Sequence, residues 1–380
     1  MPRSRAMNAS LRLLTCLALV GGFTAPLAAQ TDPAAAAQAE LTTLLAEWRA
    51  AQGAYTDALL AFGDSLEAVA ARAAGDVQRL REMRAGITAP DGSAFARRAL
   101  ALAAKHDDYG GCFALAVAQN FSGDGGVARE VAELLSGRYV MDPVVLEFLE
   151  RPAPLLAALE WDRAVLFLSR IQEAHEDGMT AAWAKYWLAR VLVLAHKEND
   201  ASPRIRQLLA DAERLAAGTL LADRIAAPRF QRERLQVGMV APELVGQDMD
   251  GRPLRLADLR GKVVVLWFWS FANVNSRACL PMMVKLDKRW QGKPLVIVGV
   301  NADVSKQYYE AKRKALGVDW RSFSEGLNAQ MGPIATRWNV RVWPTFYVLD
   351  HEGIIQYFSE SERPGDALLA PLVDAAAGAR

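Results

Sequence analysis

Apolar residues in the first part of the chain, from residue 34 to about 234, recur every three or four positions. One such series is Trp183, Trp187, Val191 and Leu194. This spacing places apolar side chains on one stripe of a helix, and runs of β-branched residues are almost absent. Glycine and proline interrupt the pattern at short intervals. We therefore expect helices of ordinary length joined by short turns, as in a helical hairpin array or solenoid.

The pattern changes near Val237. Continuous apolar runs there are typical of strands buried on both faces, and they alternate with amphipathic segments that predict helices. In order, the predicted elements are a hairpin turning at Asp250–Gly251, a strand at 263–269, a helix at 276–291, a strand at 294–301, a helix at 306–316, a strand after Pro344, a strand at 354–358 and a helix after Pro364. This order predicts a mixed sheet with helices on both faces.

The first thirty residues have a different character. Three arginines precede an apolar run at 13–20, and small residues follow at 25–30. This is the order of a secretory signal peptide, which we place at residues 1–29. The apolar run is shorter than the roughly 20 residues that span a bilayer, which favours a cleaved signal over a membrane anchor. We therefore expect an exported mature protein, periplasmic or extracellular, without a stable membrane span.

Composition and charge exclude several classes. The 380 residues are 52% hydrophobic and 23% charged, and 44 basic against 43 acidic residues give a net charge of +1. Nothing in this balance indicates a nucleic-acid partner. Three cysteines and four histidines are too few for a disulfide scaffold or a Cys/His metal cluster, so we expect no metal and no cofactor. Signal cleavage would remove Cys16 and leave Cys112 and Cys279. Cys112 lies in an apolar helix, where buried packing is the usual role.

Five short segments in the second part carry a family signature. They are Val237–Leu244, Asp258–Val265, Phe268–Trp269 with Pro281, Val298–Asp303 and Trp338–Phe346. In this order they resemble the thioredoxin-like fold, and within it the exported TlpA/ResA-type and AhpC/TSA redoxins. The resemblance covers about 237–358 and the final helix. A helical region ahead of such a domain resembles a subset of bacterial exported redoxins.

The resemblance also implies a binding groove. Pro344 would be a cis proline that faces the active-site loop, and the backbone before it would stay open to pair with a bound polypeptide. Trp343, Phe271 and Asn273 would line this groove. We therefore expect a polypeptide or partner protein to bind either at this groove or on the helical domain.

The expected active site departs from the family. In the family, Trp-Cys-Gly-Pro-Cys lies between a strand and a helix, and counting from Trp269 places its two cysteines at positions 273 and 276. Asn273 and Ser276 occupy these positions, although Pro281 stands where the register requires it. A carboxamide cannot attack a disulfide, and a serine hydroxyl without an adjacent base is a poor nucleophile. Both residues instead favour the capping of a helix N-terminus.

Cys279 leaves alternatives open. It lies three residues beyond Ser276, about one helical turn deeper on the same side. It is a displaced reactive thiol, the disulfide partner of Cys112, or a small packing residue, and the usual burial of unpaired cysteine favours the last of these.

The sequence thus predicts a signal peptide at 1–29, an all-α domain at 30–234 and an α/β thioredoxin-like domain at 235–380. Two hypotheses for its function follow. In the first, the thioredoxin-like domain has lost redox chemistry and binds a polypeptide or serves as a scaffold. In the second, the protein is a thiol–disulfide oxidoreductase or a peroxiredoxin-like antioxidant enzyme that works atypically through Cys279.

Overall fold

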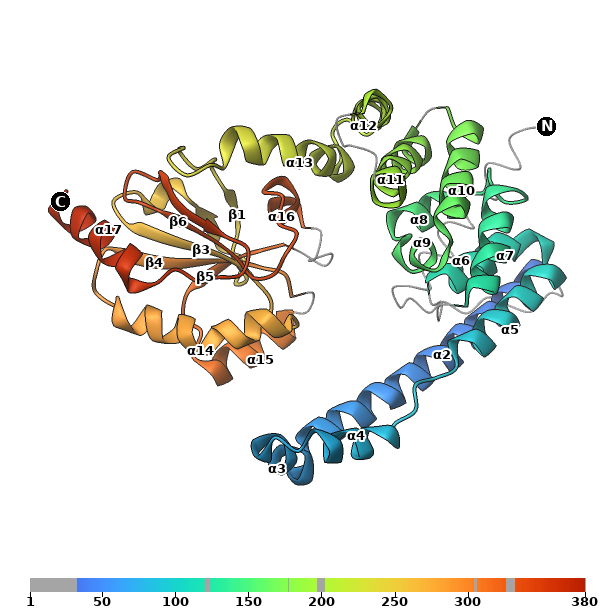
Figure 1. Ribbon diagram of the computed structural model, residues 1–380, viewed down its shortest axis with the longest axis horizontal. Helices are drawn as coiled ribbons and strands as arrows, with labels where there is room; N and C mark the ends of the chain where they lie inside the picture. The colour runs from blue at the N-terminus through green and yellow to red at the C-terminus, as the bar shows by residue number, and fades with distance from the viewer. Residues whose placement is uncertain are drawn as a thin grey trace. The chain divides into compact units, whose positions relative to one another are not determined.

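The computed structural model describes residues 33–119, 124–176, 178–196, 202–303, 306–325 and 332–379 (Figure 1). The predicted signal peptide and Cys16 lie outside these ranges. The chain divides into two compact units, of which the first ends at Leu215 and the second begins at Ala216. The combination of a helical unit and a sheet-containing unit confirms the predicted fold class.

Every element described in the first unit is helical. The helices are α2 (Pro33–Asp64), α3 (Leu66–Ala74), α4 (Val77–Ala85), α5 (Gly92–Lys105), α6 (Gly110–Gln119), α7 (Gly125–Ser136), α8 (Val144–Glu150), α9 (Ala153–Ala158), α10 (Trp161–Ala174), α11 (Gly178–His196) and α12 (Pro203–Leu215), with the 3₁₀ turn η1 (Asp107–Tyr109) before α6. Consecutive helices such as α10 and α11, and α11 and α12, are in contact, as expected for a hairpin array.

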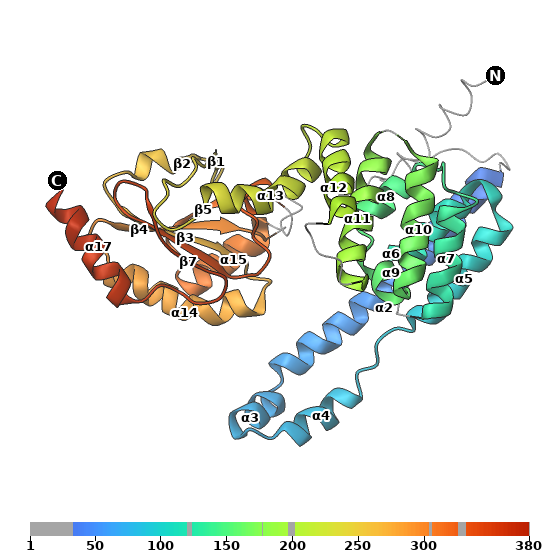
Figure 2. The same cartoon turned by 45° about the horizontal axis from the view of Figure 1, so that its top comes forward.

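The expectation of ordinary helix lengths is wrong for α2, which has 32 residues. Alanine and leucine dominate its sequence, and both residues have high helix propensity. Gly53 lies inside the helix without ending it, because one glycine costs only about 1 kcal/mol relative to alanine. The outer part of α2, with α3 and α4, forms an arm that extends from the rest of this unit (Figures 1 and 2).

The second unit is built on a five-stranded sheet in the order β5-β4-β3-β6-β7. Strands β3, β4 and β5 are parallel, and β6 is antiparallel to both of its neighbours. The elements are α13 (Leu220–Arg234), β1 (Val245–Gln247), β2 (Pro253–Arg255), η2 (Ala257–Leu259), β3 (Val263–Trp269), α14 (Val274–Arg289), β4 (Leu295–Asn301), α15 (Lys306–Leu316), β5 (Arg321–Ser324), α16 (Pro333–Arg337), β6 (Thr345–Leu349), β7 (Ile355–Ser359) and α17 (Asp366–Gly378).

Strand β3 divides the core into two layers, because all seven of its residues are buried and successive side chains point to opposite faces. Val263, Val265, Trp267 and Trp269 pack with α14, α15 and α17. Val264, Leu266 and Phe268 pack with the end of α13, the β1–β2 hairpin and α16. Figure 1 shows α14 and α15 on one side of the sheet and α13 and α16 on the other. The predicted mixed sheet with helices on both faces is confirmed.

Two elements of this unit were not predicted. Strand β5 has only four residues, and α16 has five, so neither is long enough to show a period of its own. Strand β5 forms because its residues pair with β4, from Val298 opposite Arg321 to Asn301 opposite Ser324. Together they enclose a buried acid, Glu325, at the end of the sheet.

Helix α13 belongs to the second unit, although the sequence placed residues up to 234 in the helical domain. The Arg337 guanidinium lies 5.0 Å from the centre of the Phe230 ring. The side-chain amide of Asn339 donates a hydrogen bond of 2.6 Å to Gln231 Oε1. Leu235, directly after α13, is buried in the core beside Trp338. The division of the chain therefore falls one helix earlier than the expected boundary.

Candidate functional site

The ends of four strands define one edge of the sheet. Because β3, β4 and β5 are parallel, their carboxyl ends meet there, and open α/β sheets generally bind ligands at such an edge. Thr345 at the start of β6 lies opposite Phe268, so the segment before β6 reaches the same edge. We call this region, made of residues 270–276, Asp303, Glu325 and residues 342–344, the site edge.

Asn273 is the N-cap of α14. Its Oδ1 accepts a hydrogen bond of 2.9 Å from the backbone N–H of Ser276, which satisfies one of the unpaired donors at the helix start. Ser276 is fully buried, and its hydroxyl has no hydrogen-bond partner among the described residues. The structure thus gives Asn273 the capping role that its residue type predicts.

Asp303 holds the loop between β3 and α14. Its carboxylate accepts hydrogen bonds from the Ser270 hydroxyl (2.7 Å), from the backbone N–H groups of Phe271 (2.9 Å) and Ala272 (3.1 Å), and from the Asn301 side-chain amide (2.9 Å). Ser270, Asn301 and Asp303 are all buried. Asn301 and Asp303 lie in one of the family segments of the sequence, but no role was predicted for them or for Ser270. A Ser after one buried strand and an Asn-x-Asp after the next were the available signals.

The carbonyl groups of the same loop accept hydrogen bonds from Arg277. Arg277 Nη1 donates to the carbonyl of Phe271 at 2.7 Å and to that of Ala272 at 3.0 Å. The Phe271 ring is 1% exposed and packs against Trp269 and Tyr309, with ring centres 4.7 and 5.7 Å apart. Phe271 therefore anchors the loop in the core, and its ring offers little surface to a ligand.

The Trp343–Pro344 peptide bond is cis, as the family resemblance implied. Pro344 is buried, and Trp343 is half-buried with its ring centre 6.4 Å from that of Phe268. The Thr345 hydroxyl donates to the Val342 carbonyl at 2.7 Å, which fixes the turn into β6. In contrast, the backbone N–H and C=O of Trp343 make no hydrogen bond within the described part of the chain.

No disulfide joins Cys112 and Cys279 in the structure. Cys112 is buried in α6 of the first unit. Cys279 is partly buried on α14 and packs against the core. Burial raises the pKa of the Cys279 thiol above 9.0, although the positive charge of Arg363 opposes the shift. At neutral pH this thiol carries little thiolate.

Glu325 is a buried acid that the sequence did not reveal. It follows β5 directly and is 5% exposed. Its Oε1 accepts a hydrogen bond of 3.2 Å from the Ala335 N–H, whereas Oε2 has no partner among the described residues. Burial raises the pKa of Glu325 to about 7, and backbone hydrogen bonds from Ala335 and Ile334 oppose this rise. Glu325 therefore titrates near neutral pH at the site edge.

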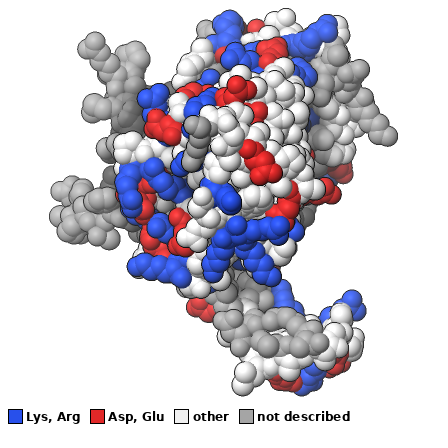
Figure 3. Space-filling view, turned by 90° about the vertical axis from the view of Figure 1, so that its left-hand side faces the viewer, with Lys and Arg blue, Asp and Glu red and all other residues white. Residues whose placement is uncertain are grey.

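Neither a metal cluster nor a membrane span is found in the described ranges. No group of three or more His, Cys, Asp or Glu side chains there is arranged to hold a metal ion. Among the described helices, none is both long enough and apolar enough to cross a bilayer. On the face seen in Figure 3, basic and acidic side chains are interspersed, in keeping with the small net charge.

The sheet order, the flanking helices and the cis proline at the edge define the second unit as a thioredoxin-like domain. Comparison with known proteins identifies it more closely. Residues 237–358 match the model of the AhpC/TSA family. The thioredoxin-like protein YneN of Bacillus subtilis is 32% identical over 127 residues, which are 32% of this chain and 70% of YneN. The chain belongs to the AhpC/TSA family through this domain.

Further relatives match the same part of the chain. The thiol-disulfide oxidoreductase ResA of Bacillus subtilis is 29% identical over 122 residues, which are 32% of this chain and 66% of ResA. For ResA of Bacillus thuringiensis the identity is 33% over 72 residues, which are 19% of this chain and 42% of the relative. Among solved structures, the thioredoxin domain of a thiol-disulfide oxidoreductase from Bacteroides vulgatus is 23% identical, with 37% of this chain and 98% of that domain covered and a TM-score of 0.32.

Proposed function

We propose that this is an exported protein whose thioredoxin-like unit binds an extended polypeptide at the site edge without exchanging disulfides. The proposal rests on one observation: Asn273 and Ser276 occupy the two positions where the family has its redox cysteines. Asn273 uses its carboxamide to cap α14, and Ser276 is buried beneath it. Relatives named thiol-disulfide oxidoreductases share this fold, and this chain has the fold without cysteines at the two positions.

The loss of exchange follows from the chemistry of the residues. Disulfide exchange needs a thiolate that attacks and a second thiol that resolves the mixed disulfide. Asn273 supplies no nucleophile, and no base pairs with the Ser276 hydroxyl among the described residues. The site edge retains hydrogen-bonding and apolar groups, which are the means of binding rather than of redox catalysis.

The backbone of Trp343 supports polypeptide binding. Its N–H and C=O have no partner in the described part of the chain, and an extended chain pairs with such groups as an added strand does. Val274 and Val342, at the two sides of the edge, are 65% and 42% exposed. They would contact apolar side chains of the bound segment.

Binding is tested with an extended polypeptide that has no thiols, the reduced and carboxymethylated insulin B chain. Val342→Asp should weaken its binding at least fivefold in fluorescence anisotropy, because a charge replaces an apolar contact. Val245, which is 63% exposed on β1, provides the matched control Val245→Asp. Equal binding by the wild type and by Val342→Asp would contradict the proposed site.

The absence of exchange is tested by restoring the cysteines. Asn273 is partly exposed and Ser276 is buried, which suits an attacking and a resolving thiol at the start of a helix. We expect the double variant Asn273→Cys/Ser276→Cys to reduce insulin disulfides with dithiothreitol as the electron source, above the background of the wild type. The single variant Asn273→Cys, which cannot close the bond, is the control. No gain in the folded double variant would show that the active-site register is different.

The second hypothesis, catalysis through Cys279, has less support, because burial raises the pKa of this thiol. Insulin reduction by the wild type that disappears in Cys279→Ser would establish it and refute the first proposal. Peptide mapping without reductant tests the Cys112–Cys279 bond separately. The proposed export is tested by sequencing the N-terminus of the secreted protein, with cleavage expected near residue 29.

A further inference from the structure

Two helices of the first unit face each other with matching stripes. Both stripes follow the spacing i, i+3, i+4 and i+7, which places the four side chains on the same face of a helix. On α7 they are Arg129, Ala132, Glu133 and Ser136, and on α10 they are Arg163, Leu166, Phe167 and Arg170. Helices α7 and α10 are in contact and lie side by side in Figures 1 and 2. Together with Leu159 these residues line a groove.

The floor of the groove is apolar and the rim is charged. Ala132, Leu159 and Phe167 are buried, whereas Leu166 is 43% exposed although its side chain is apolar. The hollow is shallow and open to solvent, so it suits a side chain of a peptide rather than a whole small molecule.

The charge of the rim is unbalanced. Three arginines stand against one acid, Glu133, whose carboxylate lies 3.7 Å from the Arg163 guanidinium. Arg129 and Arg170 are exposed and have no ion-pair partner among the described residues. They lie at opposite ends of their helix stripes, so the positive charge flanks the apolar floor. Guanidinium groups bind carboxylates with two parallel hydrogen bonds, which favours an acidic ligand.

We infer that the α7–α10 groove binds a short acidic peptide segment, with a leucine-sized side chain over Leu166 and Phe167 and carboxylates on Arg129 and Arg170. The groove lies wholly within the first unit, so this binding is independent of the function proposed for the site edge. The helical unit thereby has a partner-binding surface of its own, and its partner is an acidic, leucine-bearing stretch of polypeptide.

The test uses the full mature chain and synthetic ten-residue peptides that contain two leucines among four glutamates or aspartates. Matched peptides carry lysine in place of the acids. We expect the acidic peptides to bind and the lysine peptides to bind at least tenfold more weakly. The double variant Arg129→Glu/Arg170→Glu should lose at least tenfold in affinity for the acidic peptides. Binding should also weaken as salt rises, because the arginines are exposed.

The control is Arg81→Glu, an exposed arginine on α4 away from the groove. Its affinity for the peptides should equal that of the wild type, and circular dichroism should show unchanged helix content in all variants. A second variant, Leu166→Asp, should lose binding through the apolar floor. Three results would overturn the inference: no binding up to 1 mM peptide, equal affinity in the charge-reversed variant, or binding of inorganic pyrophosphate as tight as that of the peptides.

Discussion

At the scale of single residues, two buried acids at the site edge have opposite surroundings. Asp303 accepts hydrogen bonds from four donors, which tie the loop after β3 to the end of β4. Glu325 accepts one of 3.2 Å and leaves one oxygen without a partner in the described chain. A buried carboxylate remains charged at low cost only when donors compensate for the lost water. Asp303 acts as a structural clamp because four donors converge on it, whereas the poorly compensated burial of Glu325 raises its pKa to about 7.

Replacing Asp303 should be costly. Asp303→Ala removes the acceptor of four donors in a buried region, and each buried donor left without a partner costs about 1–3 kcal/mol. We expect the free energy of unfolding, measured by urea denaturation, to fall by about 3 kcal/mol or more. The exposed Asp319→Ala is the control and should change it by less than about 0.5 kcal/mol. A loss as small as that of the control would show that the loop does not depend on this carboxylate.

Glu325 should make stability depend on pH. With a folded pKa of about 7 and an ordinary value of 4.5, the folded state binds more protons than the unfolded state between these values. The stability that Glu325 contributes is thus fully present below pH 4.5 and is lost as pH rises to 7. The variant Glu325→Gln has no carboxyl group to ionise and therefore does not lose this stability. Between pH 5 and pH 8, its free energy of unfolding should rise relative to that of the wild type by up to about 3 kcal/mol.

The measurement is urea denaturation of both proteins at several pH values. Glu352→Gln, at an exposed acid, is the matched control and should run parallel to the wild type. A constant difference between Glu325→Gln and the wild type across this window would contradict the raised pKa.

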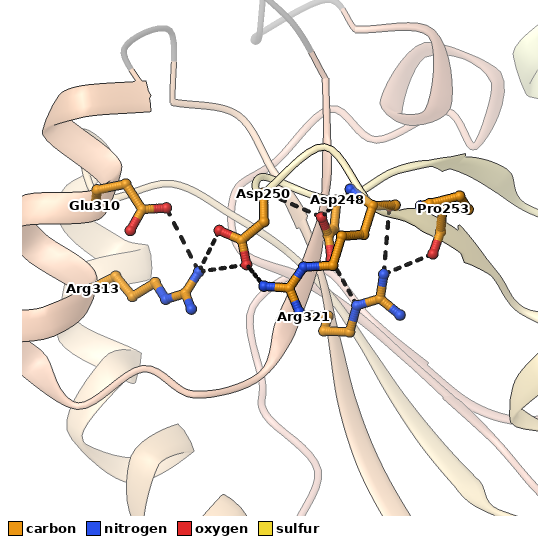
Figure 4. Close-up of polar contacts among 7 residues, drawn as sticks. Asp248, Asp250, Pro253, Glu310, Arg313 and Arg321 are labelled. Atoms are coloured by element: carbon orange, nitrogen blue, oxygen red, sulfur yellow. Dashed lines mark hydrogen bonds and ion pairs between the residues drawn. The ribbon is translucent and has the colours of Figure 1, made fainter.

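At the scale of elements, ion pairs and hydrogen bonds fasten the β1–β2 hairpin to its neighbours (Figure 4). Asp248 Oδ1 accepts from the N–H groups of Asp250 and Arg252, at 3.0 and 2.9 Å, and Oδ2 accepts from Arg321 Nε of β5 at 2.7 Å. Arg313 of α15 reaches Asp250 Oδ1 at 3.2 Å. The turn predicted at Asp250–Gly251 is confirmed, with Gly251 at φ +83°. A two-stranded hairpin is marginal by itself, so these contacts position it.

The hairpin contacts predict an acid-sensitive stability. Burial would raise the pKa of Asp248, but the hydrogen bonds from Arg252 and Arg321 outweigh it and lower the pKa below 3.8. This stabilisation is present above pH 3.8 and is lost as pH falls through the lower folded pKa. The free energy of unfolding of Asp248→Asn should therefore be about 1 kcal/mol lower than that of the wild type at pH 7. This difference should be smaller below pH 3.

Hydrogen exchange tests the same variant locally. The amides of Asp250 and Arg252 should exchange faster in Asp248→Asn than in the wild type, because their acceptor is weaker. The exposed Asp258→Asn should leave both amides unchanged. Equal protection in the two variants would mean that the turn alone holds the hairpin.

At the scale of the whole molecule, α13 decides where the thioredoxin-like unit begins. Its Phe230 packs on the core layer that contains Trp338 and Tyr347, and Gln231 bonds to Asn339. A fragment that starts at 216 should therefore be more stable than one that starts at 235. We expect the shorter fragment to melt about 5–10 °C lower, which corresponds to a loss of 2–3 kcal/mol.

A longer fragment supplies the control for this prediction. Helix α12 contacts α11 of the first unit, so a fragment of residues 202–380 should melt within about 2 °C of 216–380. Equal melting temperatures for all three fragments, measured by calorimetry, would contradict the assignment of α13 to the second unit.

The amino-acid sequence was enough to predict the fold class, the long strands and the turn of the hairpin, and to show that positions 273 and 276 carry no cysteine. These depend on periodicity, turn chemistry and residue identity, which are local properties of the chain. The other features arise from contacts between segments that are distant in the sequence. Strand β5 forms through pairing with β4, Asp303 and Glu325 gain their surroundings from segments distant in sequence, and the arginines of α7 and α10 meet across a groove. Such contacts depend on burial and on the approach of separate elements, and no local pattern encodes them.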